Sequence, residues 1–183
     1  MAKLKLAVIV GSTRKDSINR KLANALIKLA DGAFEATISQ IDDLPLYNQD
    51  LEADFPAQAN RLKSEIEAAD AILIVTPEHN RSVSAALKNA IDWASRPWGQ
   101  NSWAGRFVAV TGTSAGAVGT AVAQQQLREI MTNLAGTVAG GQYFIQFKDG
   151  LVDESGTITD EKTRAFLQGF VDGVAKTAGK LAG

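Results

Sequence analysis

Hydrophobic positions along the chain follow two periods, one typical of buried strands and one typical of amphipathic helices. Leu6–Val10, Ala71–Val75 and Phe107–Thr111 are apolar almost throughout, as expected for parallel strands that are covered on both faces. Phe34–Ile38 and Tyr143–Phe147 alternate apolar and polar residues. This alternation is typical of half-exposed strands at the edges of a sheet, and it predicts that these two segments are its outer strands.

Helical patterns separate the strands. The first helix is indicated by Ile18, Leu22, Ala25, Leu26 and Leu29; later ones by Leu62, Ile66 and Ala69, by Val83, Leu87, Ala90, Ile91 and Ala94, by Leu127, Ile130, Met131 and Leu134, and by Phe166, Phe170 and Val174. Alternation of strands and helices without a linker predicts one α/β domain over residues 1–183 with a doubly wound parallel sheet. Because the second strand reads as an edge and the third as central, we expect five strands in the order 2-1-3-4-5.

The connection between the first strand and the first helix, Gly11–Asn19, has the composition of an anion-binding loop. A strand that ends at glycine and re-enters a helix directs backbone N–H groups at a ligand, and the helix dipole favours an anion there. The side chains that can donate hydrogen bonds to such an anion are Ser12, Thr13, Ser17 and Asn19. Arg14 adds a guanidinium whose geometry suits phosphate. An ordinary turn with Ser17 or Asp16 as N-cap needs only one of these groups, so the pattern favours a phosphate site.

Two further connections, 76–82 and 112–119, follow strands of the same sheet. In such sheets ligands bind outside the carboxyl ends of the strands, where the strand order reverses, so the three loops are expected to share one site. In the 112–119 loop, Ser114 offers a hydroxyl and Gly116 permits close approach of a flat ligand. A plain tight turn explains these residues equally well.

The 76–82 loop is stiffened by Pro77, which fixes φ and removes a backbone donor. Asn80 offers both a donor and an acceptor to the edge of a planar ring, and Ser82 can cap a helix that begins at Val83. A proline turn that leads into an N-cap is the alternative interpretation.

Other side chains are candidates for chemistry or for packing. Glu78 is either a general base or a carboxylate that shapes its loop through backbone hydrogen bonds, and the second interpretation is favoured. Trp93 lies on the helix that carries Leu87 and Ile91, and packing in the core is favoured for it over contact with a ligand. Trp98 and Trp103 flank a polar loop, and they are interpreted as exposed residues of a subunit or substrate surface or as part of the core.

Composition narrows the possible functions. The 183 residues are 45% hydrophobic with a net charge of −1, so no bulk field favours nucleic acid or an anionic membrane. The chain has no cysteine and one histidine, which excludes thiolate nucleophiles, disulfides and multi-histidine metal sites. The missing cysteine excludes the low-molecular-weight phosphatases, and the lack of a Gly-Lys-Ser/Thr sequence excludes a nucleotide triphosphatase loop. A cytoplasmic protein without membrane segments is expected.

Four motifs together resemble the NADPH-dependent FMN reductase family. They are Gly11-Ser-x-Arg-x-x-Ser-x-Asn19, Pro77-Glu-His-Asn80, Leu87-Lys-Asn-Ala-Ile-Asp-Trp93 and Ser114-x-Gly116. Within the family the chain is most similar to the soluble chromate and quinone reductases. The resemblance implies a flavodoxin-like three-layer sandwich and a bound FMN. His79 stands where family members commonly have tyrosine, which puts a stacking role for this position in doubt.

The resemblance also implies which residues bind the cofactor. The phosphate would lie on Ser12, Arg14, Ser17 and Asn19, the isoalloxazine ring along Pro77–Asn80, and its polar edge near Ser114 and Gly116. The full set of implied FMN-binding residues is Gly11, Ser12, Thr13, Arg14, Ser17, Ile18, Asn19, Pro77, Glu78, His79, Asn80, Ser114, Ala115 and Gly116.

The activity implied is hydride transfer from NADPH or NADH through FMN to quinones, chromate, azo compounds or free flavins, with no catalytic side chain because the chemistry occurs at the cofactor. Arg81 is expected to attract anionic substrates, with a solvated surface charge as the alternative. A homodimer or homotetramer is expected to form through the helices after residues 82 and 116. The alternative function is a flavodoxin-type electron carrier, although such carriers are typically strongly acidic and have a Thr-rich phosphate loop.

Overall fold

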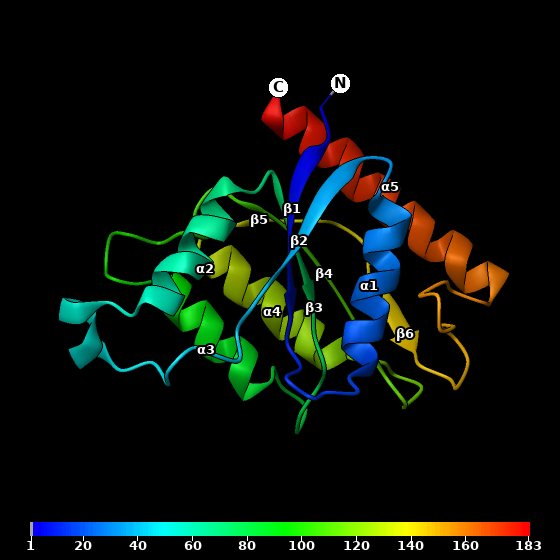
Figure 1. Ribbon diagram of the computed structural model, residues 1–183, viewed down its shortest axis with the longest axis horizontal. Helices are drawn as coiled ribbons and strands as arrows, with labels where there is room; N and C mark the ends of the chain where they lie inside the picture. Colours follow the sequence, from blue (N-terminus) through cyan, green and yellow to red (C-terminus); the bar gives the residue numbers. More distant parts are fainter. Residues whose placement is uncertain (1) are drawn as a thin grey trace.

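The computed structural model describes residues 2–183; Met1, the first residue of the expected domain, lies outside the described residues. Strands and helices alternate along the chain (Figure 1). The strands are β1 (Leu4–Val10), β2 (Phe34–Ser39), β3 (Ala71–Val75), β4 (Phe107–Ser114), β5 (Thr137–Val138) and β6 (Phe144–Gln146). The helices are α1 (Ile18–Ala30), α2 (Ala57–Ala68), α3 (Ala85–Ala94), α4 (Ala121–Asn133) and α5 (Glu161–Ala182), with a 3-10 helix at Gln49–Asp54.

The sheet is parallel and its strands follow the order β2-β1-β3-β4-β5, as predicted. This is the flavodoxin-like arrangement, with β2 at one edge. The fifth position differs from the expected single strand, because β5 and β6 both pair with β4 along different parts of its length. β6 lies within the predicted Tyr143–Phe147 strand. β5 was not predicted from the sequence, because two residues are too few to show a periodicity.

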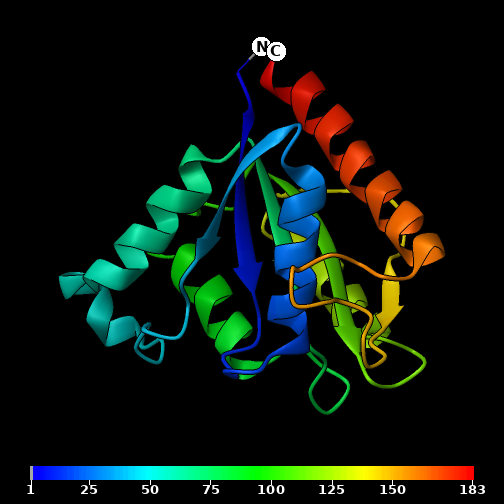
Figure 2. The same cartoon turned by 45° about the vertical axis from the view of Figure 1, so that its right-hand side comes forward.

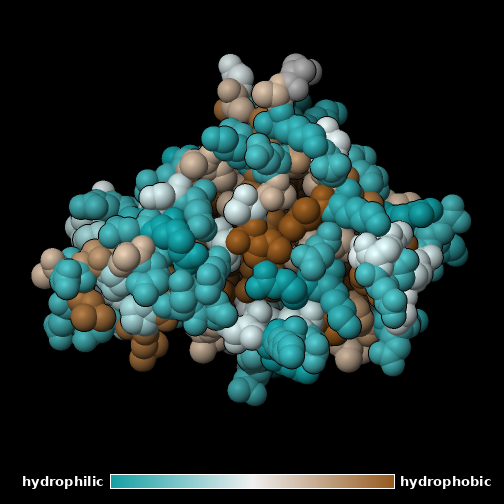
Figure 3. Space-filling view, viewed as in Figure 1, coloured by the Kyte–Doolittle hydropathy of each residue, from teal (hydrophilic) through white to brown (hydrophobic). Residues whose placement is uncertain are grey.

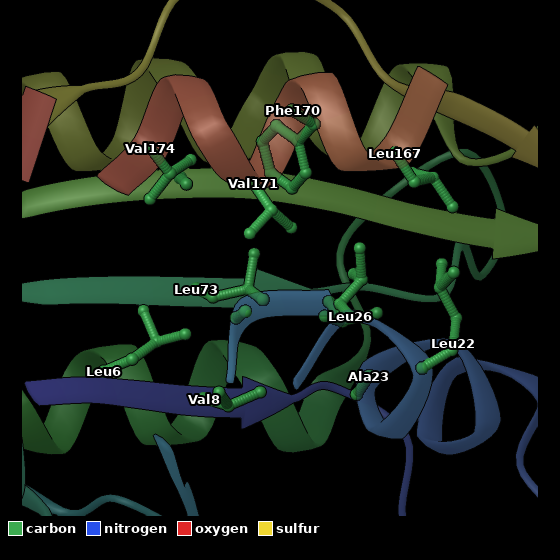
Figure 4. Close-up of a cluster of buried hydrophobic side chains, with 14 of the residues drawn as sticks. Leu6, Val8, Leu22, Ala23, Leu26, Leu73, Leu167, Phe170, Val171 and Val174 are labelled. Carbon is green, nitrogen blue, oxygen red and sulfur yellow. The ribbon is translucent and has the colours of Figure 1, made fainter. Parts of the chain in front are cut away.

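Helices cover both faces of the sheet (Figure 2). On one face α1 and α5 enclose an apolar cluster in which Leu26 and Val171 meet Leu6 and Leu73 from the sheet (Figure 4). On the other face α2, α3 and α4 pack over a second cluster that includes Ile74 and its neighbours from β1 and β4. β3 contributes to both clusters and all five of its residues are buried, which explains its unbroken apolar sequence.

The start of α1 was predicted correctly and the start of α3 was not. The Ser17 hydroxyl accepts the Arg20 N–H at 3.2 Å and caps α1. The cap of α3 is Ser84, whose hydroxyl accepts the Leu87 N–H, so this helix begins two residues after the predicted Val83. Ser82 has another role, because its hydroxyl donates to the Gln126 side chain at 2.7 Å.

The two tryptophans after α3 differ in environment. Trp98 is 86% exposed, whereas Trp103 is fully buried and its indole N–H donates to the Ile91 carbonyl at 3.2 Å. The interpretation of Trp103 as an exposed surface residue is therefore wrong. The loop between these two tryptophans is held close to the end of α3. Lys63 of α2 donates to the carbonyls of Ala94 in α3 and of Arg96 and Gln100 after it. Burial lowers the pKa of the Lys63 ammonium group.

The surface seen in Figure 3 is largely hydrophilic, with an apolar area in the middle of the face. Within residues 2–183, no helix combines the length and the apolar character needed to cross a bilayer.

Candidate functional site

The loops after β1, β3 and β4 meet at the carboxyl edge of the sheet (Figure 2). Backbone hydrogen bonds fix their relative positions: the Gly11 N–H donates to Val75 O and the Thr76 N–H donates to Thr111 O, each at 2.9 Å. The three segments that the sequence predicted to share a site are therefore adjacent in space.

The first loop presents a row of free backbone donors. Across the described part of the chain, the N–H groups of residues 12–17 donate to no protein acceptor. Ser12 is half-buried, and Thr13 and Arg14 are exposed beside it. The Ser17 hydroxyl oxygen accepts from Arg20 while its proton remains available, and Ile18 opens the helix behind it. Amides, hydroxyls and a guanidinium at a helix N-terminus form a donor set suited to a phosphate dianion.

Asn19 has a position that differs from its neighbours in the loop. It is buried, and its amide donates to Thr113 O and accepts from Thr113 N–H, each at 2.9 Å. Its hydrogen-bonding groups are therefore used to attach α1 to β4. The structure therefore brings Asn19 to the predicted site, where it supports the Gly11–Asn19 segment from beneath.

The second loop is a tight turn with a fixed shape. His79 and Ser82 exchange backbone hydrogen bonds at 3.0 and 2.9 Å around Asn80 and Arg81, whose φ angles are 51° and 61°. Residues other than glycine seldom adopt this left-handed conformation, so two of them in succession make the turn unusual. Gln126 of α4 supports the turn, because its amide donates to Arg81 O at 3.1 Å. His79 and Asn80 consequently lie exposed at the tip.

Glu78 joins the second loop to α4. One carboxylate oxygen accepts the N–H groups of Val122 and Ala123 at 3.0 and 3.2 Å, in the first turn of the helix. The other oxygen accepts from the Arg81 guanidinium at 3.2 Å. A carboxylate at a helix N-terminus satisfies free amides and interacts favourably with the dipole. Because both oxygens are used in this way, the geometry supports the loop-shaping interpretation of Glu78 over the general-base one.

The third loop is shorter than predicted. β4 continues to Ser114, so Gly112 and Thr113 belong to the strand and the connection begins at Ala115. The Ser114 hydroxyl donates to Gly119 O at 2.7 Å and closes the loop. The first part of the loop is exposed, and a Cβ built at Gly116 would have no atom nearer than 3.7 Å.

Two glycines lie in the closely packed base of the site. A Cβ at Gly112 would lie 2.0 Å from Thr76 O and 2.5 Å from the Thr120 hydroxyl. A Cβ at Gly11 would lie 3.0 Å from side-chain atoms of both Leu87 and Pro77. Glycine at these positions lets the backbones of neighbouring strands and loops approach closely.

Trp93 lies below this edge and is fully buried, as predicted. Its indole N–H donates to Pro45 O at 2.8 Å, and its ring makes edge-to-face contacts with Tyr47 and Phe55. Sequence reasoning did not identify the supporting residues Gln126 and Gln146, of which Gln146 donates to Ala115 O at 3.1 Å. Glutamines on a helix and a short strand give no sequence signal for such a role.

The residues present fit FMN. The donor set of residues 12–17 matches its phosphate, and the neighbouring stiff turn offers the exposed His79 and Asn80 to a planar ring, while Pro77 is buried beneath them. Glycines in the base and the open Gly116 leave room for close approach.

Comparisons with known proteins agree with this geometry. Residues 4–149 match the family model described as NADPH-dependent FMN reductase. A 2-hydroxy-1,4-benzoquinone reductase of Burkholderia sp is 48% identical over 170 residues, covering 92% of this chain and 93% of the relative. A quinone reductase of Pseudomonas putida is also 48% identical over 169 residues, covering 91% of this chain and 90% of the relative.

A solved structure is similar over nearly its whole length. It is a flavoenzyme NAD(P)H:(acceptor) oxidoreductase from Paracoccus denitrificans, with a TM-score of 0.94, 48% identity, and coverage of 97% of this chain and 98% of that one. The predicted fold and enzyme class are confirmed, and the carrier alternative is disfavoured. This chain belongs to the NADPH-dependent FMN reductase family.

Proposed function

We propose that this protein is a cytoplasmic NAD(P)H:quinone oxidoreductase that holds FMN at the edge formed by its three loops. The observation that carries the proposal is the row of free amides at residues 12–17 beside Arg14, at the N-terminus of α1. Two relatives at 48% identity are named as quinone reductases, and they support quinones as the class of electron acceptor. A cytoplasmic location agrees with the availability of NADPH and NADH there.

In this proposal the first loop binds the FMN phosphate. Ser12, Thr13, Arg14 and Ser17 donate to it, Gly11 allows the close approach, and Ile18 and Asn19 hold the first turn of α1 in place. The positive end of the helix dipole adds to the attraction. Bound FMN supplies hydride acceptance and the delivery of two electrons to an acceptor.

The second and third loops orient the ring. Pro77, Glu78, His79 and Asn80 line one side, with Glu78 fixing the turn through α4. Ser114, Ala115 and Gly116 lie at the polar edge of the ring, where Gln146 supports the Ala115 carbonyl. These residues position the cofactor, and none of them has to move a proton.

Arg81 is proposed to attract the anionic reactants. Its side chain is 72% exposed and is held over the site by the turn and by Glu78. An exposed guanidinium at this position raises the local concentration of NADPH phosphates or of chromate. We include chromate, azo compounds and free flavins among the acceptors on the family resemblance.

Initial-rate kinetics test the proposal directly. Oxidation of NADPH and NADH is measured on one preparation with a quinone, chromate and oxygen as acceptors. One opening serves donor and acceptor in turn, so we expect parallel double-reciprocal lines at several fixed quinone concentrations. A protein that retains FMN and oxidises neither nucleotide would be an electron carrier, and intersecting lines would require a separate nicotinamide site.

A further inference from the structure

A pocket lies between the end of α2 and the edge strand β2, away from the three loops. Its volume is about 240 Å³. Lys5, Glu35 and Ala69 line it together with Ser39 and Glu65, and they come from the start of β1, from β2 and from α2 and its end. Its β1 residues, Lys5–Ala7, lie in the first half of that strand, whereas its β2 residues run from Glu35 to the last residue, Ser39. The three flavin-binding loops lie at the carboxyl ends.

Small side chains explain why the pocket forms. In the β1–β2 register Lys5 pairs with Glu35 and Ala7 pairs with Thr37, so these four residues share one face of the sheet. α2 packs its large apolar residues, including Ile66, against the central strands of this face. At the end of this helix, Ala68 and Ala69 line the pocket together with Ala7, Thr37 and Ser39 of the strands, and these short side chains leave the space unfilled.

Two polar atoms at this pocket are buried and unpaired. Among residues 2–183, neither the Ser39 hydroxyl nor the Glu65 Oε2 atom has a hydrogen-bond partner. Ser39 is 2% exposed. Buried polar atoms in proteins are nearly always paired, so these two require a partner that comes from outside the chain. Because a carboxylate can only accept, that partner must be a hydrogen-bond donor.

The charges around the pocket favour a cationic donor. Lys5 and Glu35 are neighbours in the β1–β2 register and both are exposed, so this side of the pocket carries one charge of each sign. The other Glu65 oxygen lies 3.8 Å from the Arg61 guanidinium, which makes its shorter contact, at 3.0 Å, with Asp43. The Glu65 carboxylate is therefore only weakly compensated by protein groups.

We propose that this pocket binds a small primary ammonium compound. The ammonium group donates to Glu65 Oε2 and to the Ser39 hydroxyl, and a short alkyl group lies against Ala7 and Ala69. An ammonium group suits the pair because it has three donors and a positive charge. The site is distinct from the flavin site, so its occupancy does not depend on the reductase activity.

Calorimetric titration of the FMN-loaded protein with ethylammonium chloride at constant ionic strength tests this site. We expect saturable binding that is weakened at least about tenfold in Glu65→Gln and weakened also in Ser39→Ala. Glu129→Gln, which changes an exposed carboxylate on α4, is the matched control and should bind as the unchanged protein does. Because Glu65→Gln and Ser39→Ala conserve shape, FMN content and circular dichroism should remain unchanged and exclude misfolding.

Three results would overturn the proposal. They are the absence of saturable binding, equal affinity in Glu65→Gln and the unchanged protein, and equal binding of KCl and ethylammonium chloride, which would indicate a general cation site. A crystal soaked in ethylammonium chloride gives an independent reading. Ligand density joining Ser39 and Glu65 would support the proposal, and water alone at these atoms would contradict it.

Discussion

The side-chain amide of Asn19 and the backbone of Thr113 form a reciprocal pair of hydrogen bonds, each 2.9 Å long, across 94 positions of sequence. The pair attaches the first turn of α1 to the end of β4, next to the loop of residues 11–17 that is proposed to bind phosphate. A short turn could hold this loop only locally. Because of this pair, the position of the loop depends on β4 and on the sheet to which β4 belongs.

Replacing Asn19 with aspartate should destabilise the protein. The introduced carboxylate could still accept from the Thr113 N–H, but its second oxygen would face Thr113 O in a buried place. We expect the free energy of unfolding to fall by about 2–3 kcal/mol, measured by urea denaturation of the apoprotein. Asn24→Asp, at an exposed position of the same helix, should change it by less than about 0.5 kcal/mol. Equal stabilities of the two variants would contradict a structural role for the amide.

Replacing Arg14 with alanine should weaken FMN binding and leave riboflavin binding unchanged. A charge-assisted bond to the phosphate contributes about 1.5–3 kcal/mol, equivalent to about ten- to hundredfold in Kd. Fluorescence titration of the apoprotein with both flavins measures the effect. Lys15→Ala removes an exposed charge from the next position and serves as the control. Equal affinities of the unchanged protein for FMN and riboflavin would show that residues 11–19 do not bind the phosphate.

Replacing Glu78 with glutamine should loosen the junction between the second loop and α4. The side chain of Glu78 is 9% exposed and serves two helix amides and Arg81, whereas a glutamine oxygen is uncharged. We expect a loss of about 1–2 kcal/mol in the free energy of unfolding together with weaker FMN retention. Glu129→Gln, on the exposed side of α4, should leave both unchanged. A Glu78→Gln variant that keeps its stability and loses only turnover would revive the general-base interpretation.

We expect the protein to form at least a dimer in solution, through α3 and α4. The exposed Trp98 follows α3 and is available for such a contact, whereas Trp103 is not. Light scattering at micromolar concentration should give the mass of a dimer or tetramer. A fully active monomer at this concentration would exclude the expected assembly.

Stability should decline in acid partly through Asp160, the N-cap of α5. Hydrogen bonds from the Thr163 side chain and backbone hold the pKa of Asp160 below its ordinary value of 3.8. The unfolded chain thus binds this proton more readily, so the contribution is complete above the ordinary pKa and is lost as the pH falls through the lower folded value. Asp160→Asn conserves a capping side chain but cannot titrate. When the pH is lowered from neutral to acid, the thermal midpoint of this variant should therefore fall by less than that of the unchanged protein.

Long, regular features of the sequence predicted the fold well. The unbroken apolar runs of β1, β3 and β4 reflect burial on both faces, and the order of the strands followed from the contrast between the apolar β3 and the alternating β2. Features that depend on a few residues or on distant contacts were not predictable. β5 has only two residues. The burial of Trp103 depends on the loop after α3, whose carbonyls accept hydrogen bonds from the distant Lys63 of α2.

The predicted site shows the same division. Local signals identified the three loops, because glycine, proline and hydroxyl residues act on their immediate neighbours. Thr113, the partner of Asn19, and Val122, one of the partners of Glu78, lie 94 and 44 positions away, and nothing near Asn19 or Glu78 in the sequence indicates these distant hydrogen bonds. Position along the loop could thus predict that these residues belong to the site, but only the tertiary structure separates those that face outward from those that support the loop.

The close packing at Gly112 sets limits on redesign of this enzyme. Any side chain there would meet the Thr76 carbonyl, an atom of the neighbouring strand end that cannot turn aside. A variant library aimed at new electron acceptors should therefore keep Gly11 and Gly112 fixed. Diversity belongs instead at Ala117 and Val118, which are exposed and follow the residues proposed to contact the flavin. The proposed flavin site can therefore be varied at its exposed side, whereas a side chain at Gly112 would displace the backbone on which the site rests.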